Sequence, residues 1–189
     1  MEFDAQMAQE QKSGKENIIF REIAHADNAA LANVIRRVME EFKIDRPGTI
    51  YVEPSTDHLF ELFQSEPRST YFVIDLNGAV AGGAGIFPTD ELPGGVCELV
   101  KMYLTPAARG KGVAKELISR CLETAKELGY HSVYLESMPE LKQALRLYEY
   151  FGFQYLDKPM GNSQHTSTSI WMIKTLSQRP LNFVKHASE

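Results

Sequence analysis

The sequence predicts an α+β fold built on a mixed sheet. Segments with the two-residue alternation of strands are interspersed with segments whose apolar residues recur at helical spacing. The dipeptide Asn77-Gly78 separates two strand-like segments and is a strong signal for a two-residue hairpin turn. A strand, a tight glycine turn and a helix follow one another from Glu98 to Leu122. Together these patterns predict the order strand, two helices, three strands, helix, strand, helix, two strands.

The first half of the chain is expected to contain one strand, two helices and a hairpin. The segment 18–23 reads as a strand, and the apolar stripe of 29–42 is typical of an amphipathic helix. A second helix is expected from a cap at Ser55 or Thr56 to Phe63.

The hairpin is expected to pair Thr70–Asp75 with Ala79–Phe87, and a loop follows from Pro88 to Gly95. Three glycines interrupt the second of these strands. Glycine is costly inside a strand, so these positions indicate the close approach of a ligand or of another backbone.

The stretch from Glu98 to Leu122 predicts an anion-binding turn. Alternating apolar residues up to Leu104 are typical of a strand, and Pro106 ends it because proline has no amide hydrogen for a sheet. The turn alternates two cations with two glycines, at Arg109, Gly110, Lys111 and Gly112. The helix that follows offers unpaired amides and a positive dipole end, and the glycines leave room for a phosphate to reach them. Plain packing of a strand against a helix is the alternative explanation.

The remaining elements follow this central stretch. Gly129 is expected to end its helix. Thereafter the pattern predicts a strand at 131–136, a helix at 139–150, a strand at 153–156, a loop at 160–164 and a strand at 166–174.

Composition indicates an ordinary globular protein. The 189 residues suffice for one domain with a proper core, expected over 18–176, between tails at 1–17 and 177–189. The net charge of −5 argues against a nucleic-acid partner, because affinity for phosphate backbones comes mainly from clustered cations. Cys97 and Cys121 are expected to be reduced thiols. With neither a signal-peptide pattern nor an apolar run of membrane-spanning length, we expect a cytoplasmic protein without a membrane partner.

Two motifs resemble the signatures of the GCN5-related N-acetyltransferases, the GNAT family. RGKGVA fits R-x-x-G-x-G/A, with Arg109, Gly112 and Ala114 at its defined positions. ALRLYEYFGF, from Ala144 to Phe153, resembles A-x-x-L-Y-x-x-x-G-F. The motifs occur in the family's order and at about its usual separation, and the resemblance is clear from about 96 to 176.

The resemblance implies the GNAT fold, a three-layer α/β/α sandwich. Its mixed, mostly antiparallel sheet of six to seven strands has a central parallel pair that splays apart. The resemblance also implies that the glycine turn holds the pyrophosphate of acetyl-coenzyme A (acetyl-CoA), and no metal is expected. The residues expected to bind this cosubstrate are Met102, Tyr103, Leu104, Arg109, Gly110, Lys111, Gly112, Val113 and Ala114. Leu141 departs from the pattern, because many members carry an asparagine there.

Acetyl transfer to an amine needs a base, donors for an oxyanion and a proton for the departing thiolate. We expect Glu98 to be the base, with Glu136 and His165 as alternatives, since an amine with a pKa of about 10 must lose a proton. In the family a bulge commonly frees amides at the segment 102–104 for the thioester carbonyl. Tyr148, the tyrosine of the second motif, is expected to protonate the sulfur, and a core tyrosine is the alternative.

The expected function is that of an acetyl-CoA-dependent N-acetyltransferase, an acyltransferase for groups other than aminoacyl groups. We expect direct attack of a small-molecule amine on the thioester. A non-catalytic acyl-CoA sensor or interaction module on the same fold is one alternative, and a protein or peptide N-acetyltransferase is another. The sequence does not identify the acceptor, and it leaves a homodimer open, since dimers are common in the family.

Overall fold

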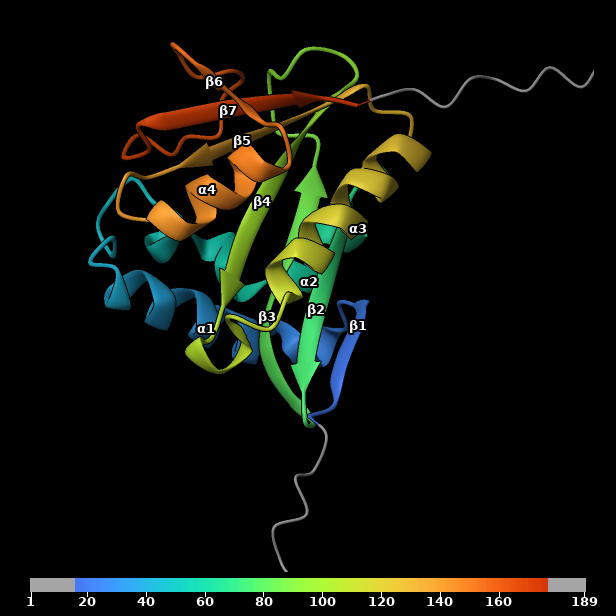
Figure 1. The fold of residues 1–189 in the computed structure, drawn as a ribbon, viewed down its shortest axis with the longest axis vertical. Helices are drawn as coiled ribbons and strands as arrows, with labels where there is room; N and C mark the ends of the chain where they lie inside the picture. The colour runs from blue at the N-terminus through green and yellow to red at the C-terminus, as the bar shows by residue number, and fades with distance from the viewer. Residues whose placement is uncertain (1–15, 177–189) are drawn as a thin grey trace, which may run out of the picture.

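A single seven-stranded sheet organises the computed structural model, which describes residues 16–176 (Figure 1). The strands lie in the order β1-β2-β3-β4-β5-β7-β6, and only β4 and β5 run parallel. Their bounds are β1 Ile18–Glu22, β2 Thr70–Leu76, β3 Ala79–Phe87, β4 Val96–Leu104, β5 Ser132–Ser137, β6 Gln154–Leu156 and β7 Ile170–Thr175. The sheet runs from the first described strand to the last, and the single domain over 18–176 stays a prediction.

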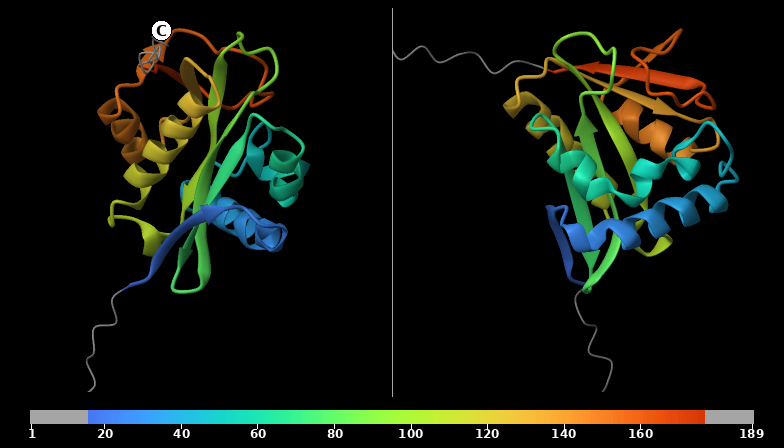
Figure 2. Two further views of the ribbon diagram at one scale, coloured as in Figure 1. Left: turned by 90° about the vertical axis from the view of Figure 1, so that its right-hand side faces the viewer. Right: turned by 180° about the vertical axis from the view of Figure 1, so that it is seen from behind.

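Helices cover both faces of this sheet (Figure 2). On one face lie α1 (Asn28–Glu41) and α2 (Leu59–Gln64), and on the other lie α3 (Val113–Glu127) and α4 (Lys142–Tyr150). Each face has its own apolar core, because each helix turns its apolar stripe towards the sheet. The predicted α+β three-layer sandwich is therefore confirmed. Within 16–176 the helices are too short or too polar to cross a membrane.

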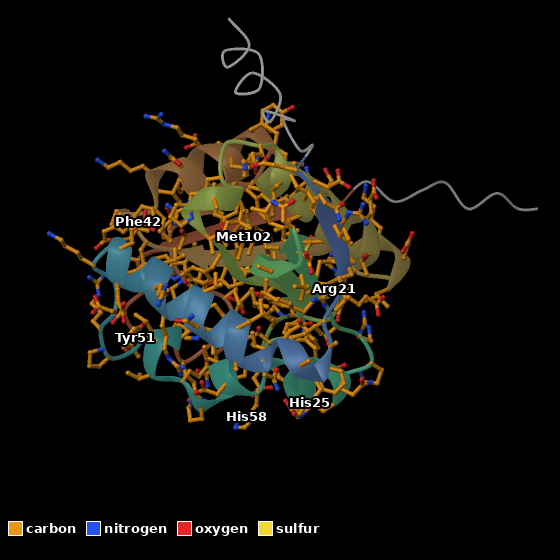
Figure 3. All side chains as sticks on the ribbon, turned by 90° about the horizontal axis from the view of Figure 1, so that it is seen from below. Arg21, His25, Phe42, Tyr51, His58 and Met102 are labelled. Atoms are coloured by element: carbon orange, nitrogen blue, oxygen red, sulfur yellow. The ribbon has the colours of Figure 1, made fainter. Side chains whose placement is uncertain are left out.

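Short 3-10 helices and free thiols complete the description. The 3-10 helices are η1 His25–Asp27, η2 Ile50–Val52, η3 Pro54–Asp57 and η4 Pro106–Ala108. Figure 3 shows α1 crossing its face of the sheet, with Phe42 at its end and Met102 among the interior side chains. Cys97 and Cys121 are buried free thiols, and burial raises the pKa of Cys97 to about 12.

The two parallel strands separate after three residue pairs. Val96, Cys97 and Glu98 of β4 pair with residues 132–134 of β5, and no pairing between these strands continues beyond Glu98. Yet β4 runs on to Leu104 and β5 to Ser137. The predicted splay of the central pair is therefore present, and it leaves unpaired strand edges in the middle of the molecule.

Several predicted boundaries differ from the structure. The predicted second helix is divided into η3 and α2 by His58, whose backbone is not helical. The last strand begins at Ile170, later than predicted, because Thr168 turns back to bond the carbonyl of His165. A turn that Leu141 closes on Met138 delays the start of α4 to Lys142.

The termini were predicted as tails over 1–17 and 177–189. Residues 1–15 and 177–189 lie outside the described residues. Asn17 does not belong to a detached tail, because its amide and carbonyl both bond to Asn77 at the hairpin turn.

Candidate active site

Two cavities meet where β4 and β5 separate. One, of about 540 Å³, lies between the glycine turn, β4 and α4, and we call it the turn groove. The other, of about 530 Å³, lies on the α1 and α2 side of the sheet and contains several carboxylates; we call it the acidic pocket. Four residues line both cavities, namely Leu99, Lys101, Tyr103 and Glu136.

The glycine turn leaves the first amides of α3 uncovered. Gly110 and Gly112 have φ of 74° and 78°, a region that disfavours any residue with a Cβ. A Cβ built on either glycine meets no atom within 4 Å, so open space lies beside both. Gly112 is the N-cap of α3, and no side chain caps that end. Unpaired amides at the positive end of a helix dipole form a site for an anion.

Both cations of the turn are already paired with glutamates. Arg109 donates to Glu41 at 2.6 and 2.8 Å and to the carbonyl of Leu104 at 3.1 Å. Lys111 pairs with Glu16. Any anion at the turn would therefore depend mainly on backbone amides, while Arg109 ties the end of β4 to α1.

The inner end of the turn groove holds a bulge and a buried tyrosine. Gly83 faces Tyr103 and Gly85 faces Val100, so one residue of β3 stands opposite two residues of β4, Lys101 and Met102. Tyr148 lies against this bulge, with its hydroxyl 3.9 Å from the sulfur of Met102. Burial raises the pKa of the Tyr148 phenol, which keeps it protonated at neutral pH.

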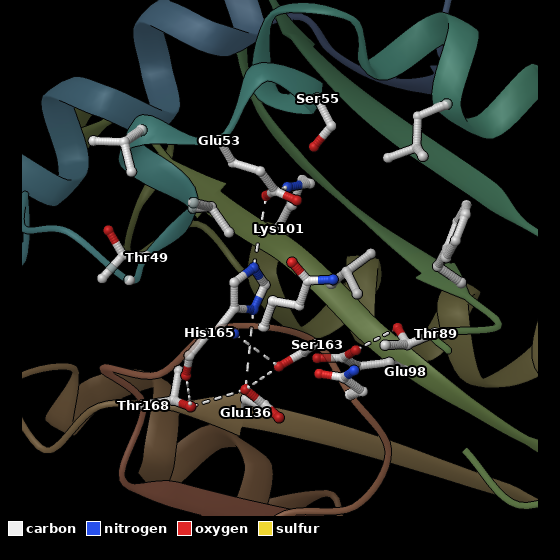
Figure 4. A pocket seen from close by; sticks show the side chains of 18 of the residues that line it. Thr49, Glu53, Ser55, Thr89, Glu98, Lys101, Glu136, Ser163, His165 and Thr168 are labelled. Atoms are coloured by element: carbon white, nitrogen blue, oxygen red, sulfur yellow. Dashed lines mark hydrogen bonds and ion pairs between the residues drawn. The ribbon is translucent and has the colours of Figure 1, made fainter. Parts of the chain in front are cut away.

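Glu98 lies at the floor of the acidic pocket (Figure 4). The residue is only 3% exposed, and one carboxylate oxygen accepts a 2.5 Å hydrogen bond from Thr89. Burial raises the pKa of Glu98 to about 7, and the negative charge of Glu136 acts in the same direction. A carboxylate with this pKa can accept a proton near neutral pH.

Glu136 faces Glu98 across the splay and is held by three hydroxyls. Tyr134 donates to one of its oxygens at 2.9 Å, and Ser163 and Thr168 donate to the other at 2.9 and 2.8 Å. These donors leave little of its hydrogen-bonding capacity free. They also fix the position of the Glu136 carboxylate opposite Glu98.

His165 lies between two carboxylates. Its Nδ1 is 3.9 Å from Glu136, and its Nε2 is 3.6 Å from Glu53 (Figure 4). Ligand atoms of Glu98, Glu136 and His165 all lie within 4.8 Å of one another. One histidine and two carboxylates are ligand types that divalent metals accept, so these three residues could hold an ion.

The structure thus brings together all three residues that the sequence offered as candidates for the general base. Glu98, Glu136 and His165 share the acidic pocket, whereas Tyr148 lies in the turn groove. Lys115 also lines the turn groove and was missed, although its place in the first turn of the helix was a usable signal. Glu53 was missed because it lies in an irregular segment without a motif.

Known sequences give the family. The sequence model of the Acetyltransferase (GNAT) family matches residues 35–153. The chain belongs to the GNAT acetyltransferase family. The N-acetyltransferase YjgM of Escherichia coli (strain K12), named as uncharacterized, is 38% identical over 159 residues, covering 84% of this chain and 95% of that protein. Uncharacterized N-acetyltransferase YsnE of Bacillus subtilis (strain 168) is 30% identical, covering 68% and 84%. This GNAT protein is accordingly an N-acetyltransferase.

Solved structures of GNAT proteins share the fold. A GNAT-family acetyltransferase from Staphylococcus aureus Mu50 matches with a TM-score of 0.74 and 20% identity, covering 85% of this chain and all of that one. YncA of Salmonella typhimurium, solved with its cofactor acetyl-CoA, matches with a TM-score of 0.67 and 20% identity, covering 86% and 96%. The predicted GNAT fold is therefore confirmed.

Proposed function

We propose that the protein transfers the acetyl group of acetyl-CoA to the amine of a small molecule. The observation that carries the proposal is that two cavities meet at the splayed strands, with Glu98 in one and Tyr148 in the other. The turn groove would hold the cosubstrate, with its diphosphate on the amides that follow Gly112. YncA, which shares this fold, was solved with acetyl-CoA, which supports acetyl-CoA as the cosubstrate.

The amine would attack the thioester directly. Glu98 takes a proton from the acceptor ammonium, directly or through a water, and the free amine nitrogen bonds to the carbonyl carbon. Amides of the segment 102–104, at the bulge of β4, stabilise the oxyanion. When the carbon–sulfur bond breaks, the phenol of Tyr148 gives its proton to the thiolate. The attacking nitrogen loses its second proton to solvent. Glu98 then releases its proton to solvent, and Tyr148 regains one from solvent.

The walls of the acidic pocket favour a small acceptor. Ser167 donates to the carbonyls of Gly48 and Pro47 at 3.1 and 2.8 Å, which joins two loops that contribute Gly48 and Thr168 to the lining of the pocket. A peptide lying across the splay would have to part these loops. The carboxylates of Glu98 and Glu136 would attract the ammonium form of the acceptor.

A thiol-release screen tests the proposal. Purified protein with acetyl-CoA is offered amino acids, polyamines, aminoglycosides and short peptides, and free coenzyme A is measured. We expect release above the background hydrolysis with small amines and not with peptides. Release with peptides alone would contradict the small-molecule acceptor. Binding of coenzyme A without turnover on any acceptor would contradict the catalytic assignments.

Three further expectations stay predictions. Turnover that persists after treatment with a chelator would support a reaction without metal, although Glu98, Glu136 and His165 offer ligand atoms. The mass of the protein in solution would decide between a monomer and a homodimer. The cytoplasmic location awaits fractionation of cells.

A further inference from the structure

Lys101 adopts a backbone conformation that its surroundings must enforce. Its φ is 50°, in the left-handed region that side chains with a Cβ disfavour. Five non-glycine residues among 16–176 have positive φ, and Lys101 is the one inside a strand. Such conformations persist where neighbouring groups fix them, and they often occur at functional sites.

A buried tyrosine holds the backbone of Lys101. Tyr71 of β2 is 1% exposed, and its hydroxyl donates to the carbonyl of Lys101 at 2.9 Å. To reach it, the ring passes over β3 at Gly83 and Gly85, where a Cβ would lie 2.5 and 2.7 Å from ring atoms. These strand glycines therefore make room for the tyrosine, which explains the close approach that the sequence indicated.

A carboxylate of the acidic pocket holds the other end of Lys101. The lysine side chain is 6% exposed, and its ammonium lies 2.7 Å from Glu53. This ion pair fixes the buried Lys101 side chain, since separating the pair would leave its ammonium without a partner.

We propose that Tyr71, Lys101 and Glu53 form a positioning clamp that aims the amides of the segment 102–104 at the thioester carbonyl. The clamp holds the bulge at its backbone and at its side chain, immediately before that segment. The proposal rests on the proposed function, because it assumes that acetyl-CoA occupies the turn groove. The three are positioning residues, since they act through the amides.

Infrared spectroscopy of bound acetyl-CoA tests the clamp without an acceptor. With the acetyl carbonyl labelled by ¹³C, we expect its stretch to move to lower frequency in the wild-type complex, because amide donors polarise it. Tyr71→Phe and Lys101→Met should return the frequency towards that of free acetyl-CoA. They should also lower kcat by roughly 100-fold, the scale of a displaced oxyanion donor. Affinity for coenzyme A, which has no thioester carbonyl, should stay unchanged.

Two variants provide matched controls. Tyr130 is also buried and its hydroxyl donates to a backbone carbonyl at 2.8 Å, but it lines neither cavity. Lys126 is an exposed lysine of α3. Tyr130→Phe and Lys126→Met should keep the wild-type frequency and kcat.

The outcomes separate the clamp from the proposed function. The clamp is overturned if Tyr71→Phe and Lys101→Met bind coenzyme A and their complexes with acetyl-CoA keep the wild-type carbonyl frequency. It is also overturned if acetyl-CoA bound to the wild type has the same carbonyl frequency as free acetyl-CoA. If Lys101→Met does not fold, Glu53→Gln tests the same ion pair, because Glu53 is partly exposed and its substitution disturbs the core less. A wild-type shift without acetylation of any amine would leave the clamp standing and contradict the proposed function.

Discussion

The turn groove is lined mainly by residues from two stretches, 99–115 and 136–148, to which α1 adds Val38 and Phe42. The acidic pocket draws ionisable side chains from four stretches, at 39–62, 87–103, 136–138 and 162–168. A motif can encode the first because neighbours in the sequence remain neighbours in space. The second depends on long-range packing. The difference suggests that the groove serves a fixed cosubstrate, while the pocket sets the choice of acceptor.

The two cavities also differ in how their charged side chains are paired. Beside the turn groove, the cations Arg109 and Lys111 of the glycine turn pair with glutamates, which leaves backbone amides as the expected donors to an anion. In the acidic pocket, burial and the nearby Glu136 charge leave Glu98 with a pKa of about 7. A variant that alters one cavity should therefore change either the affinity for coenzyme A or the rate of proton transfer, and not both.

The largest effect is expected from Glu98→Gln in the acidic pocket. Removing a general base should lower kcat/KM by about 1000-fold. In the wild type, kcat/KM should rise with pH and level off above about 7, because Glu98 must lose its proton before it can act. The variant should lack this rise while binding coenzyme A normally, as a pH series would measure. If His165→Ala removes the rise and Glu98→Gln keeps it, the base is His165.

The same substitution should change stability with pH. The pKa of Glu98 is raised from 4.5 to about 7 by folding, so folding favours its protonated form. The associated stability is fully present below pH 4.5 and is lost as the pH rises through 7, by about 3 kcal/mol in all. Glu98→Gln should not show this loss. Urea unfolding of both proteins at pH 5 and pH 8 measures it, and parallel changes in the two would contradict the buried carboxyl.

In the turn groove, Gly112→Asp should weaken coenzyme A binding by roughly 100-fold, or about 2.7 kcal/mol. A carboxylate would stand beside the proposed diphosphate site and repel it. Gly129→Asp is the matched control, because Gly129 has a φ of 80° and equally open surroundings at the far end of α3. Calorimetry with coenzyme A compares the two. Equal losses would indicate backbone strain and not a phosphate site at Gly112.

A smaller effect is expected from Tyr148→Phe. Loss of the proton donor should lower kcat by about tenfold, because a thiolate whose thiol has a pKa of about 8.5 leaves readily without help. Binding of coenzyme A should not change. Tyr150→Phe, at an exposed position on the same helix, serves as the control. An unchanged rate in Tyr148→Phe would assign Tyr148 to the core alone.

Much of the fold was predictable because local patterns and global packing agree. The hairpin at Asn77-Gly78, the strand that ends before Pro106 and the helix from Val113 all lie where the sequence placed them. Predictions failed where a side chain overrides propensity. Thr168, for example, bonds back to His165 and shortens the last strand to Ile170–Thr175. The strand glycines signalled a close approach, but only the structure identifies the ring of Tyr71 as what approaches.

The sequence by itself determined the family, the glycine turn and the residue types that meet in the site. These features depend on short spacings, such as Arg109 to Ala114, which local backbone geometry converts directly into structure. Only the tertiary structure decided that Glu98, Glu136 and His165 share one pocket, and that Glu53 reaches Lys101 across 48 residues of chain. The physical reason is that the pKa of Glu98 and the conformation of Lys101 depend on neighbours brought together by packing from distant parts of the chain.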